Sequence, residues 1–192
     1  MEKMIKEIIQ DSITTKALLL YDEDIIKKIR ACADIITKTL KKGGKVLIFG
    51  NGGSAADSQH FAAELVGRFQ KKRKALAAIS LTTDTSILTS LSNDYSFDIV
   101  FARQIEANGG PRDLAFAIST SGKAKSVIRG VKEAKKLKIK TIGLTGKDGG
   151  ELAKIADLSI VIPSFVTARI QETHILIIHI ICELVEESCT KK

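Results

Sequence analysis

Five short apolar runs, each followed by small or polar residues, constrain the fold of this 192-residue chain more than any other feature. Helical patterns fill the gaps between the runs, and strands that alternate with helices form βαβ units around a parallel sheet. The runs lie at residues 46–49, 76–79, 114–118, 141–144 and 158–162. Because ligands bind at the carboxyl ends of the strands in such sheets, the polar residues after the runs predict a binding site at that edge.

Helical patterns also flank the five runs at both ends of the chain. Apolar residues recur at helical spacing from Ile25 to Leu40, and residues 12–19 fit an earlier helix that bends near Tyr21 and Asp22. A last helix is expected over residues 168–187. We therefore predict one α/β domain over residues 1–192, in which residues 1–43 form a helical N-terminal extension.

The composition excludes several classes of protein. Hydrophobic residues make up 44% of the chain, which is enough for a continuous core, whereas aromatic residues make up only 5%, which disfavours nucleic-acid binding by base stacking. The net charge of +8 comes largely from lysines, which we interpret as solvated helix faces. The three cysteines have no CxxC spacing, and no apolar run is long enough to span a bilayer. These features predict a cytoplasmic protein with reduced thiols and with no membrane or nucleic-acid partner.

The segment after the first apolar run combines a glycine-rich turn with a polar helix. The glycines of residues 50–53 expose backbone N–H groups, and Ser54 stands where a helix N-cap is expected. A strand, a loop and a helix in this order form an anion site. Further along the helix, His60 and Glu64 are four residues apart and share a face, which indicates a metal-binding or acid–base pair.

Two further loops carry polar side chains. Ser119, Thr120 and Ser121 follow the third run and precede a glycine, so their hydroxyl and N–H groups suit a phosphate monoester, although ordinary N-capping would also explain them. Asn93 and Asp94 could hold sugar hydroxyls, and an Asx turn explains them about as well.

Two of the three histidines lie in the last predicted helix. His179 interrupts an apolar run and needs a partner such as a carboxylate or a metal, whereas we interpret His174 as structural. Gln171 and His179 are about 12 Å apart along a helix, so one ion reaches both only with stretched side chains. Either Gln171 sits in an opened first turn, or the ligands come from more than one chain. By spacing alone, Glu172 shares a face with His179 better than Gln171 does.

These residues together resemble the phosphoheptose isomerase family of the sugar isomerase (SIS) domain class, nearly from end to end of the chain. The serine loop marks the broad class, and the His60/Glu64 and Gln171/His179 pairs narrow the resemblance to the heptose enzymes. The matching segments are Gly50–Ser54, His60–Arg68, Asn93–Asp94, Ile118–Gly122, Leu144–Gly149 and Arg169–His179.

The resemblance implies a three-layer, flavodoxin-like α/β/α sandwich with a five-stranded parallel sheet, a helical N-terminal arm and a long C-terminal helix. It also implies a homotetramer with active sites at subunit interfaces. The implied reaction converts sedoheptulose 7-phosphate to D-glycero-D-manno-heptose 7-phosphate through an enediol, for bacterial surface heptose in lipopolysaccharide or capsule.

The resemblance further implies one Zn²⁺ per subunit, held by His60, Glu64, Gln171 and His179. Glu64 and His179 are the implied catalytic residues, as acid–base groups. The implied substrate contacts are Asn51, Gly52, Gly53, Glu64, Asn93, Asp94, Ser119, Thr120, Ser121 and Gln171.

One departure from the family pattern concerns the phosphate loop. After Ser-Thr-Ser-Gly the family commonly has Asn-Ser, and that serine contacts phosphate; here Lys123 and Ala124 stand instead. Ala124 lacks the hydroxyl donor, and the charge of Lys123 could partly compensate. The difference bears on substrate affinity more than on reaction class.

Three alternatives remain open from the sequence. The chain could be another sugar-phosphate isomerase with the same serine loop, or a non-catalytic SIS homologue that binds a replication initiator protein. The presence of His60, Glu64, Gln171 and His179 together favours the heptose isomerase over both. The third and weakest alternative is that the basic surface binds a polyanion.

Overall fold

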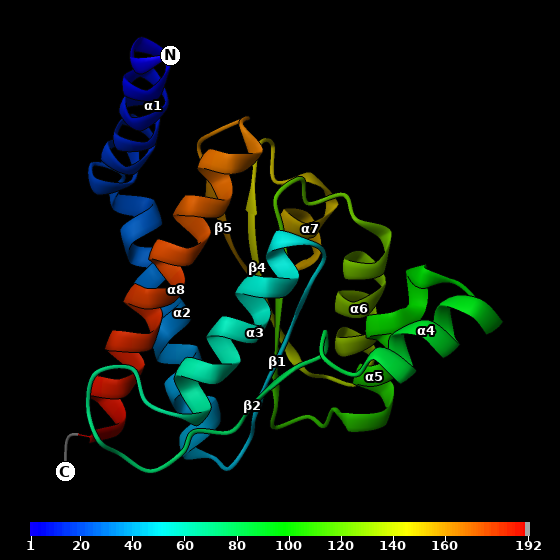
Figure 1. The fold of residues 1–192 in the computed structure, drawn as a ribbon. Coiled ribbons are helices and arrows are strands. Elements are labelled where there is room, and N and C mark those ends of the chain that lie inside the picture. Colours follow the sequence, from blue (N-terminus) through cyan, green and yellow to red (C-terminus); the bar gives the residue numbers. More distant parts are fainter. Residues whose placement is uncertain (191–192) are drawn as a thin grey trace.

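A five-stranded parallel sheet forms the middle layer of the computed structural model, which describes residues 1–190 (Figure 1). The strands are β1 (Val46–Gly50), β2 (Ala78–Ser80), β3 (Leu114–Ser119), β4 (Lys140–Gly146) and β5 (Leu158–Ile162). Their order across the sheet is β2-β1-β3-β4-β5, and every neighbouring pair is parallel. This is the flavodoxin-like order, so the predicted three-layer sandwich is confirmed.

Helices cover both faces of the sheet (Figure 1). One face carries α2 (Glu23–Lys41), α3 (Gly53–Val66) and α8 (Thr167–Thr190). The other carries α5 (Val100–Asn108), α6 (Lys125–Lys136) and α7 (Gly150–Ile155), with α4 (Thr85–Asp94) and the short 3₁₀ helix η1 (Phe97–Ile99) beside α5. No helix within residues 1–190 combines the length and apolar composition needed to cross a membrane.

The alternation of side chains along β1 explains why its sequence is continuously apolar. Val46 and Ile48 pack in the cluster under α2, α3 and α8, whereas Leu47 and Phe49 pack in the cluster under α5 and α6. All of these side chains are fully buried. A parallel strand with helices on both faces has no solvent-facing side, so every position favours an apolar residue.

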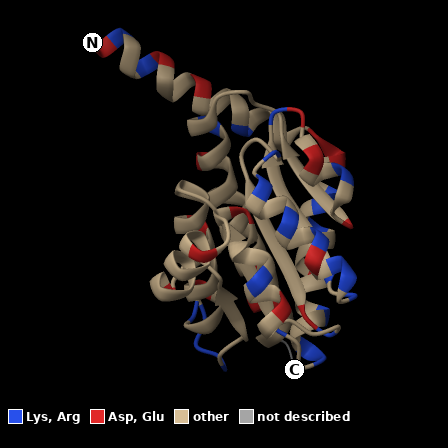
Figure 2. Cartoon of the chain, turned by 90° about the vertical axis from the view of Figure 1, so that its right-hand side faces the viewer, with Lys and Arg blue, Asp and Glu red and all other residues tan. Residues whose placement is uncertain are grey.

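The first helix, α1 (Glu2–Leu20), projects from the domain (Figures 1 and 2). Helix α1 ends at Leu20, and Tyr21 is its C-cap. Asp22 then caps α2, because its carboxylate accepts the backbone N–H groups of Asp24 and Ile25 at 3.0 Å. The predicted bend near Tyr21 and Asp22 is therefore confirmed. Helix α2 packs on α8 through its apolar face.

Strand β2 begins two residues later than predicted. The sequence indicates a strand over 76–79, but Leu76 donates its N–H to the carbonyl of Leu65 at the end of α3 (3.1 Å). This contact keeps residue 76 in the loop, so β2 pairs with β1 only from Ala78 to Ser80.

Candidate functional site

The loops that follow β3 and β4 are packed together at the carboxyl edge of the sheet. Leu152 donates its N–H to the carbonyl of Gly122 (3.0 Å), and a Cβ at Gly122 would collide with the carbonyl of Gly149. Gly122 also has a φ of +64°, a conformation that favours glycine. The loop of Ser119, Thr120 and Ser121 is therefore held in place from one side.

Helix α3 begins in the glycine loop after β1, one residue before the predicted N-cap, Ser54. Gly52 precedes the first helical residue with a φ of +57°, and Ser54 makes no side-chain cap. Ser54 instead lies buried in the first turn and donates its N–H to the carbonyl of Asn51 (3.0 Å). The expectation of a Ser54 N-cap is wrong, because the positive φ that this turn requires falls on Gly52 and moves the helix start forward.

The side chain of Asn51 connects this loop with the helix after the serine loop. Its amide nitrogen lies 3.0 Å from the hydroxyl of Ser126 in α6, whereas its amide oxygen is buried without a hydrogen-bond partner. The hydroxyl of Thr145, at the end of β4, is also buried without a partner. Because buried polar atoms are normally hydrogen-bonded, these two atoms mark positions for a polar ligand or for water.

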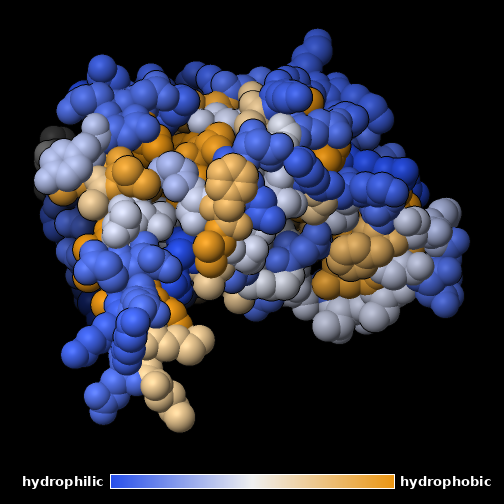
Figure 3. Space-filling view, turned by 90° about the horizontal axis from the view of Figure 1, so that it is seen from above, coloured by the Kyte–Doolittle hydropathy of each residue, from blue (hydrophilic) through white to orange (hydrophobic). Residues whose placement is uncertain are grey.

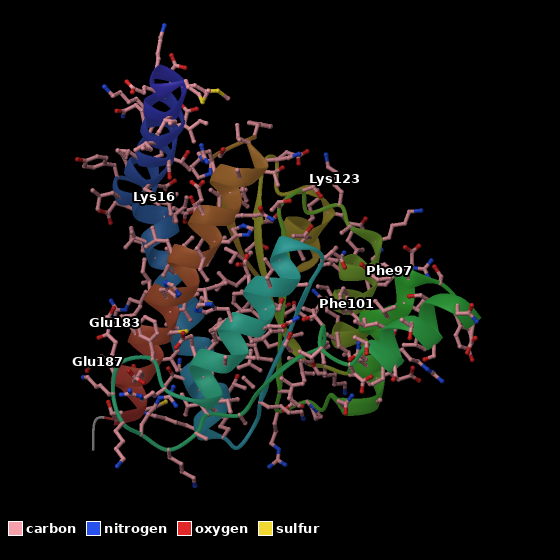
Figure 4. The ribbon with its side chains drawn as sticks, viewed as in Figure 1. Lys16, Phe97, Phe101, Lys123, Glu183 and Glu187 are labelled. Atoms are coloured by element: carbon pink, nitrogen blue, oxygen red, sulfur yellow. The ribbon has the colours of Figure 1, made fainter. Side chains whose placement is uncertain are left out.

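Lys123 lies on the same edge of the sheet (Figure 4). Its positive charge is paired with a neighbouring carboxylate and is therefore not fully available to a phosphate. Its Nζ pairs with the carboxylate of Asp148 at 2.9 Å, and both side chains are exposed. The hydrogen bond from Lys123 lowers the pKa of Asp148. Ala124 is the residue before α6 and supplies no side-chain cap.

Three of the predicted site residues meet between α3 and α8, which run side by side (Figure 1). Nε2 of His60 lies 3.1 Å from Oε1 of Glu64 and 3.1 Å from Nε2 of His179. The side chains of His60 and Glu64 are 44% and 25% exposed. We call His60, Glu64 and His179 the histidine–glutamate cluster; it is open to solvent and presents two imidazoles and one carboxylate.

The two histidines of α8 have opposite surroundings, and one of them differs from the prediction. The sequence indicates that His179 is buried by its apolar neighbours, but it is partly exposed, whereas His174 is fully buried. Nε2 of His174 lies 3.2 Å from the carbonyl of Thr145, and burial lowers the pKa of His174 to about 4. Its structural interpretation thus agrees with its position.

The side chain of Gln171, in α8, lies apart from His179 and packs against the first residue of α3. A Cβ on Gly53 would collide with its amide group. Helix α8 is continuous from Thr167, so Gln171 does not occupy an opened first turn. Glu172 does not approach His179 either, because its carboxylate accepts hydrogen bonds from Arg169 and from Ser12 of α1. The distance between Gln171 and His179 along the helix had left two alternatives, an opened first turn or ligands from more than one chain. Only the second alternative remains.

Within residues 1–190, no group of three or more His, Cys, Asp or Glu side chains has the arrangement of a metal site. Both short contacts of the cluster are made by the same atom, Nε2 of His60. The chemistry of the donors nevertheless fits Zn²⁺, which favours imidazole nitrogen and carboxylate oxygen. Two ligands of a tetrahedral zinc with bonds of about 2.1 Å are about 3.4 Å apart, which is close to the separations of 3.1 Å in the cluster.

Asn93 and Asp94 are not brought to the cluster within one chain. They are the last residues of α4, both are exposed, and the amide of Asn93 donates to the carboxylate of Asp94 at 2.9 Å. Helix α4 packs on α5 and η1, on the side of the molecule away from α8 (Figure 1).

Two residues beside the cluster were not predicted from the sequence. Asp57 lies one turn before His60; burial raises its pKa to about 6, an effect that His60 opposes, and its Oδ2 has no hydrogen-bond partner. The ring of Phe69 packs on that of His179, with centroids 5.6 Å apart. The i, i+3 spacing of Asp57 and His60 was a usable signal, whereas no local pattern links Phe69 to His179.

Comparisons with known proteins agree with this arrangement. The sequence matches the SIS domain family over residues 14–146. It is 53% identical to a phosphoheptose isomerase of Aquifex aeolicus over 187 residues, which cover 97% of each chain. It is 55% identical to phosphoheptose isomerase 1 of Campylobacter jejuni over 171 residues, which cover 88% of this chain and 92% of that one.

A solved structure supports the same assignment. The phosphoheptose isomerase of Neisseria gonorrhoeae superposes with a TM-score of 0.92 at 41% identity, covering 97% of this chain and 98% of the other. Similarity of this extent in both sequence and structure shows membership. The chain belongs to the phosphoheptose isomerase family of SIS-domain enzymes.

Proposed function

We propose that this isomerase interconverts sedoheptulose 7-phosphate and D-glycero-D-manno-heptose 7-phosphate. The observation that carries the proposal is the histidine–glutamate cluster, in which His60 of α3 contacts both Glu64 of the same helix and His179 of α8 at 3.1 Å. Helix α3 also begins at the glycine loop of the carboxyl edge, so one helix joins the cluster to a ligand-binding edge.

The carboxyl edge would bind the phosphate and the sugar chain. Ser119, Thr120 and Ser121 offer hydroxyl and backbone N–H donors to the phosphate oxygens. The unpartnered amide oxygen of Asn51 and the open space above Gly52 leave room for the sugar hydroxyls. Gln171 lies against Gly53 and would contact the same substrate.

His60, Glu64 and His179 would hold Zn²⁺, with Gln171 as a fourth ligand when the subunits assemble. A bound zinc supplies Lewis-acid polarisation of the carbonyl and hydroxyl oxygens of the substrate. The nitrogen and carboxylate donors support this proposal. The long separation of Gln171 from His179 along α8 explains why a single chain would not complete the ligand set.

Glu64 is the proposed base that moves a proton between the two reacting carbons. Its carboxylate would take the proton from C1 of the ketose and return it to C2, so that the carbonyl moves from C2 to C1 through an enediol. His179 would donate a proton to the oxygen at C2 and accept the proton from the oxygen at C1. Each of these acid–base roles accounts for a rate factor of about 10²–10⁴.

Assembly into a homotetramer is part of the proposal. Helix α1 exposes Met4, Ile5, Ile8, Ile9 and Ile13 to solvent. Figure 3 looks onto the carboxyl edge and shows hydrophobic residues along one side of the projecting helix. A second subunit would cover these residues and could bring Asn93 and Asp94 to a neighbouring cluster. We further propose that the enzyme works in the cytoplasm and supplies heptose for lipopolysaccharide or capsule.

The test is a turnover assay combined with metal analysis. Purified protein is incubated with sedoheptulose 7-phosphate as isolated, after treatment with a chelator, and after zinc is restored, and the aldose phosphate is measured by NMR. We expect turnover that the chelator abolishes and zinc restores. Conversion of a ketohexose phosphate in preference to the heptulose phosphate, or no aldose phosphate at any zinc content, would contradict the proposed reaction.

A further inference from the structure

The loop between α3 and β2 is tied to the end of α8 by a buried ion pair that the proposed reaction does not use directly. Nε of Arg73 lies 2.9 Å from Oε1 of Glu186, and their side chains are only 4% and 2% exposed. Breaking a buried pair leaves an uncompensated charge, so this contact fixes the two segments firmly. Figure 4 labels Glu183 and Glu187 on the same end of α8, away from Lys123 at the carboxyl edge.

The Glu186 carboxylate also binds the backbone of the loop. It accepts the N–H groups of Phe69, Gln70 and Lys71 at 3.0, 2.7 and 2.7 Å. Burial alone would raise the pKa of Glu186, but these N–H groups and the Arg73 guanidinium outweigh it and lower that pKa. A charged carboxylate on α8 therefore organises four donors from one loop.

Arg73 reaches from the same loop to the end of α3. Its guanidinium donates to the backbone carbonyls of Glu64 (2.8 Å) and Leu65 (2.9 Å). These carbonyls lie in the last turn of the helix and have no partner within it. A positive charge there also complements the negative end of the helix dipole. The guanidinium thus holds the backbone of Glu64, a member of the cluster.

Phe69 links the same network to the other helix of the cluster. Its N–H is held by Glu186, and its ring packs on the imidazole of His179, with the ring centroids 5.6 Å apart and the planes inclined by 38°. The His179 ring in turn lies 5.1 Å from that of His60. Each helix of the cluster therefore has one contact with this loop close to its functional side chain.

We propose that Arg73, Glu186 and Phe69 are positioning residues that set the register of α3 against α8 and so the relative placement of Glu64 and His179. The inference rests on the proposed isomerisation only for its kinetic effect. Misplacement of an acid–base group by about 1 Å costs on the order of 10²-fold in rate, so loss of the ion pair should act on kcat rather than on substrate binding.

The test compares Glu186→Gln with Asp113→Asn, a matched control whose hydrogen-bond partners are Lys45 and Gly110 and not the two helices of the cluster. The Asp113 carboxylate is also buried and accepts two backbone N–H groups and the ammonium group of Lys45, at 2.7 to 2.9 Å. We expect Glu186→Gln to lower kcat about 10- to 100-fold with KM within about twofold. Asp113→Asn should lower the melting temperature similarly while kcat stays near that of the wild type.

A second readout does not depend on activity. The chain contains three histidines, so three imidazoles appear in the spectrum of protein labelled with ¹⁵N-histidine. Glu186→Gln should shift the resonances of His60 and His179 and leave that of His174 in place, whereas Asp113→Asn should move none of them. Phe69→Leu removes only the ring on His179 and gives the same test if Glu186→Gln fails to fold.

The outcomes separate the positioning role from the reaction. If the wild type does not isomerise sedoheptulose 7-phosphate, the proposed reaction fails, and the histidine spectra still decide the positioning role. If the wild type turns over and Glu186→Gln matches Asp113→Asn in kcat and in all three imidazole resonances, or Phe69→Leu leaves His179 unshifted, the positioning role is overturned.

Discussion

The two edges of the sheet satisfy their polar groups in opposite ways. At the amino edge, Asp113 accepts three hydrogen bonds, and Asp157 accepts the N–H and hydroxyl of Thr141 at 2.8 and 2.9 Å. At the carboxyl edge, the amide oxygen of Asn51 and the hydroxyl of Thr145 are buried without partners. Because buried polar groups normally have hydrogen-bond partners, these two atoms are available to a polar ligand or to water.

The amino edge contributes mainly to stability, whereas the carboxyl edge leaves polar groups free to bind a substrate. The carboxylates at the amino edge are already hydrogen-bonded to groups of the strands and loops. At the carboxyl edge, donors and acceptors remain available to a substrate. Figure 2 shows that the Lys and Arg residues are spread over several helices and loops. We therefore expect substitutions at the carboxyl edge and its cluster to change turnover, and substitutions at the amino edge to change stability.

Glu64→Gln is the substitution with the largest expected effect. The amide cannot act as a base, so kcat should fall by a factor of about 10²–10⁴. The fold should survive, because Glu64 is held by its backbone carbonyl, which the substitution leaves intact. Turnover and thermal unfolding of the same preparation check both statements. Near-normal kcat in a folded variant would remove Glu64 from the proposed role.

His174 should make stability depend on pH, although it lies only five residues from His179. In the folded state its pKa is about 4, below the ordinary value of 6.5. As the pH falls from 6.5 towards 4, the unfolded state binds a proton that the folded state does not, so the free energy of unfolding falls. The loss by pH 4 is at most about 3 kcal/mol.

The check is urea unfolding at several pH values for the wild type and for His174→Gln. Glutamine can retain the donor to the carbonyl of Thr145, so the variant should fold and should lose this part of the pH dependence. An unchanged difference in the free energy of unfolding between pH 6.5 and pH 4 would show that His174 is not its source.

Asp113→Asn tests the amino edge. Replacing the carboxylate weakens its bonds to the backbone N–H groups of Lys45 and Gly110 and removes the pairing with the Lys45 ammonium. Because Lys45 remains 29% exposed, we expect a loss of about 2 kcal/mol in the free energy of unfolding, with kcat unchanged. A large fall in kcat without a loss of stability would erase the distinction between the two edges.

Ala124→Ser has the smallest expected effect and sharpens the comparison at the carboxyl edge. A serine before α6 can cap the helix, which gains about 1 kcal/mol, and it adds a hydroxyl close to the serine loop. One additional hydrogen bond of about 1 kcal/mol lowers KM by roughly fivefold. The free energy of unfolding and KM measure the two effects separately. A rise in the free energy of unfolding with an unchanged KM would show that a serine at position 124 caps α6 but does not contact the substrate.

The sequence was a good guide to the elements and a weaker guide to the contacts between them. The apolar runs of β1, β3 and β4 are buried on both faces, and that of β5 is fully buried only at Ile160 and Ile162, yet the apolar composition of all four located them. Strand β2 has only three residues, and a tertiary contact of Leu76 decides its start. Short edge strands depend on such contacts more than on their own sequence.

The site shows the same division. The i, i+4 spacing indicated that His60 and Glu64 share a face of α3, and their contact at 3.1 Å confirms it. The exposure of His179 could not be predicted, because it depends on where α3 and Phe69 pack against α8. Whether Gln171 joins the cluster depends on subunit contacts and stays a prediction.

Hydrogen–deuterium exchange with and without sedoheptulose 7-phosphate tests the contrast between the two edges most directly. We expect the substrate to slow exchange in residues 50–60 and 119–126, which contain the glycine loop, the start of α3 and the serine loop. Exchange in residues 110–114 and 138–141, at the amino edge, should stay the same. Protection confined to the amino edge, or no protection at a saturating substrate concentration, would show that the carboxyl edge does not bind the substrate.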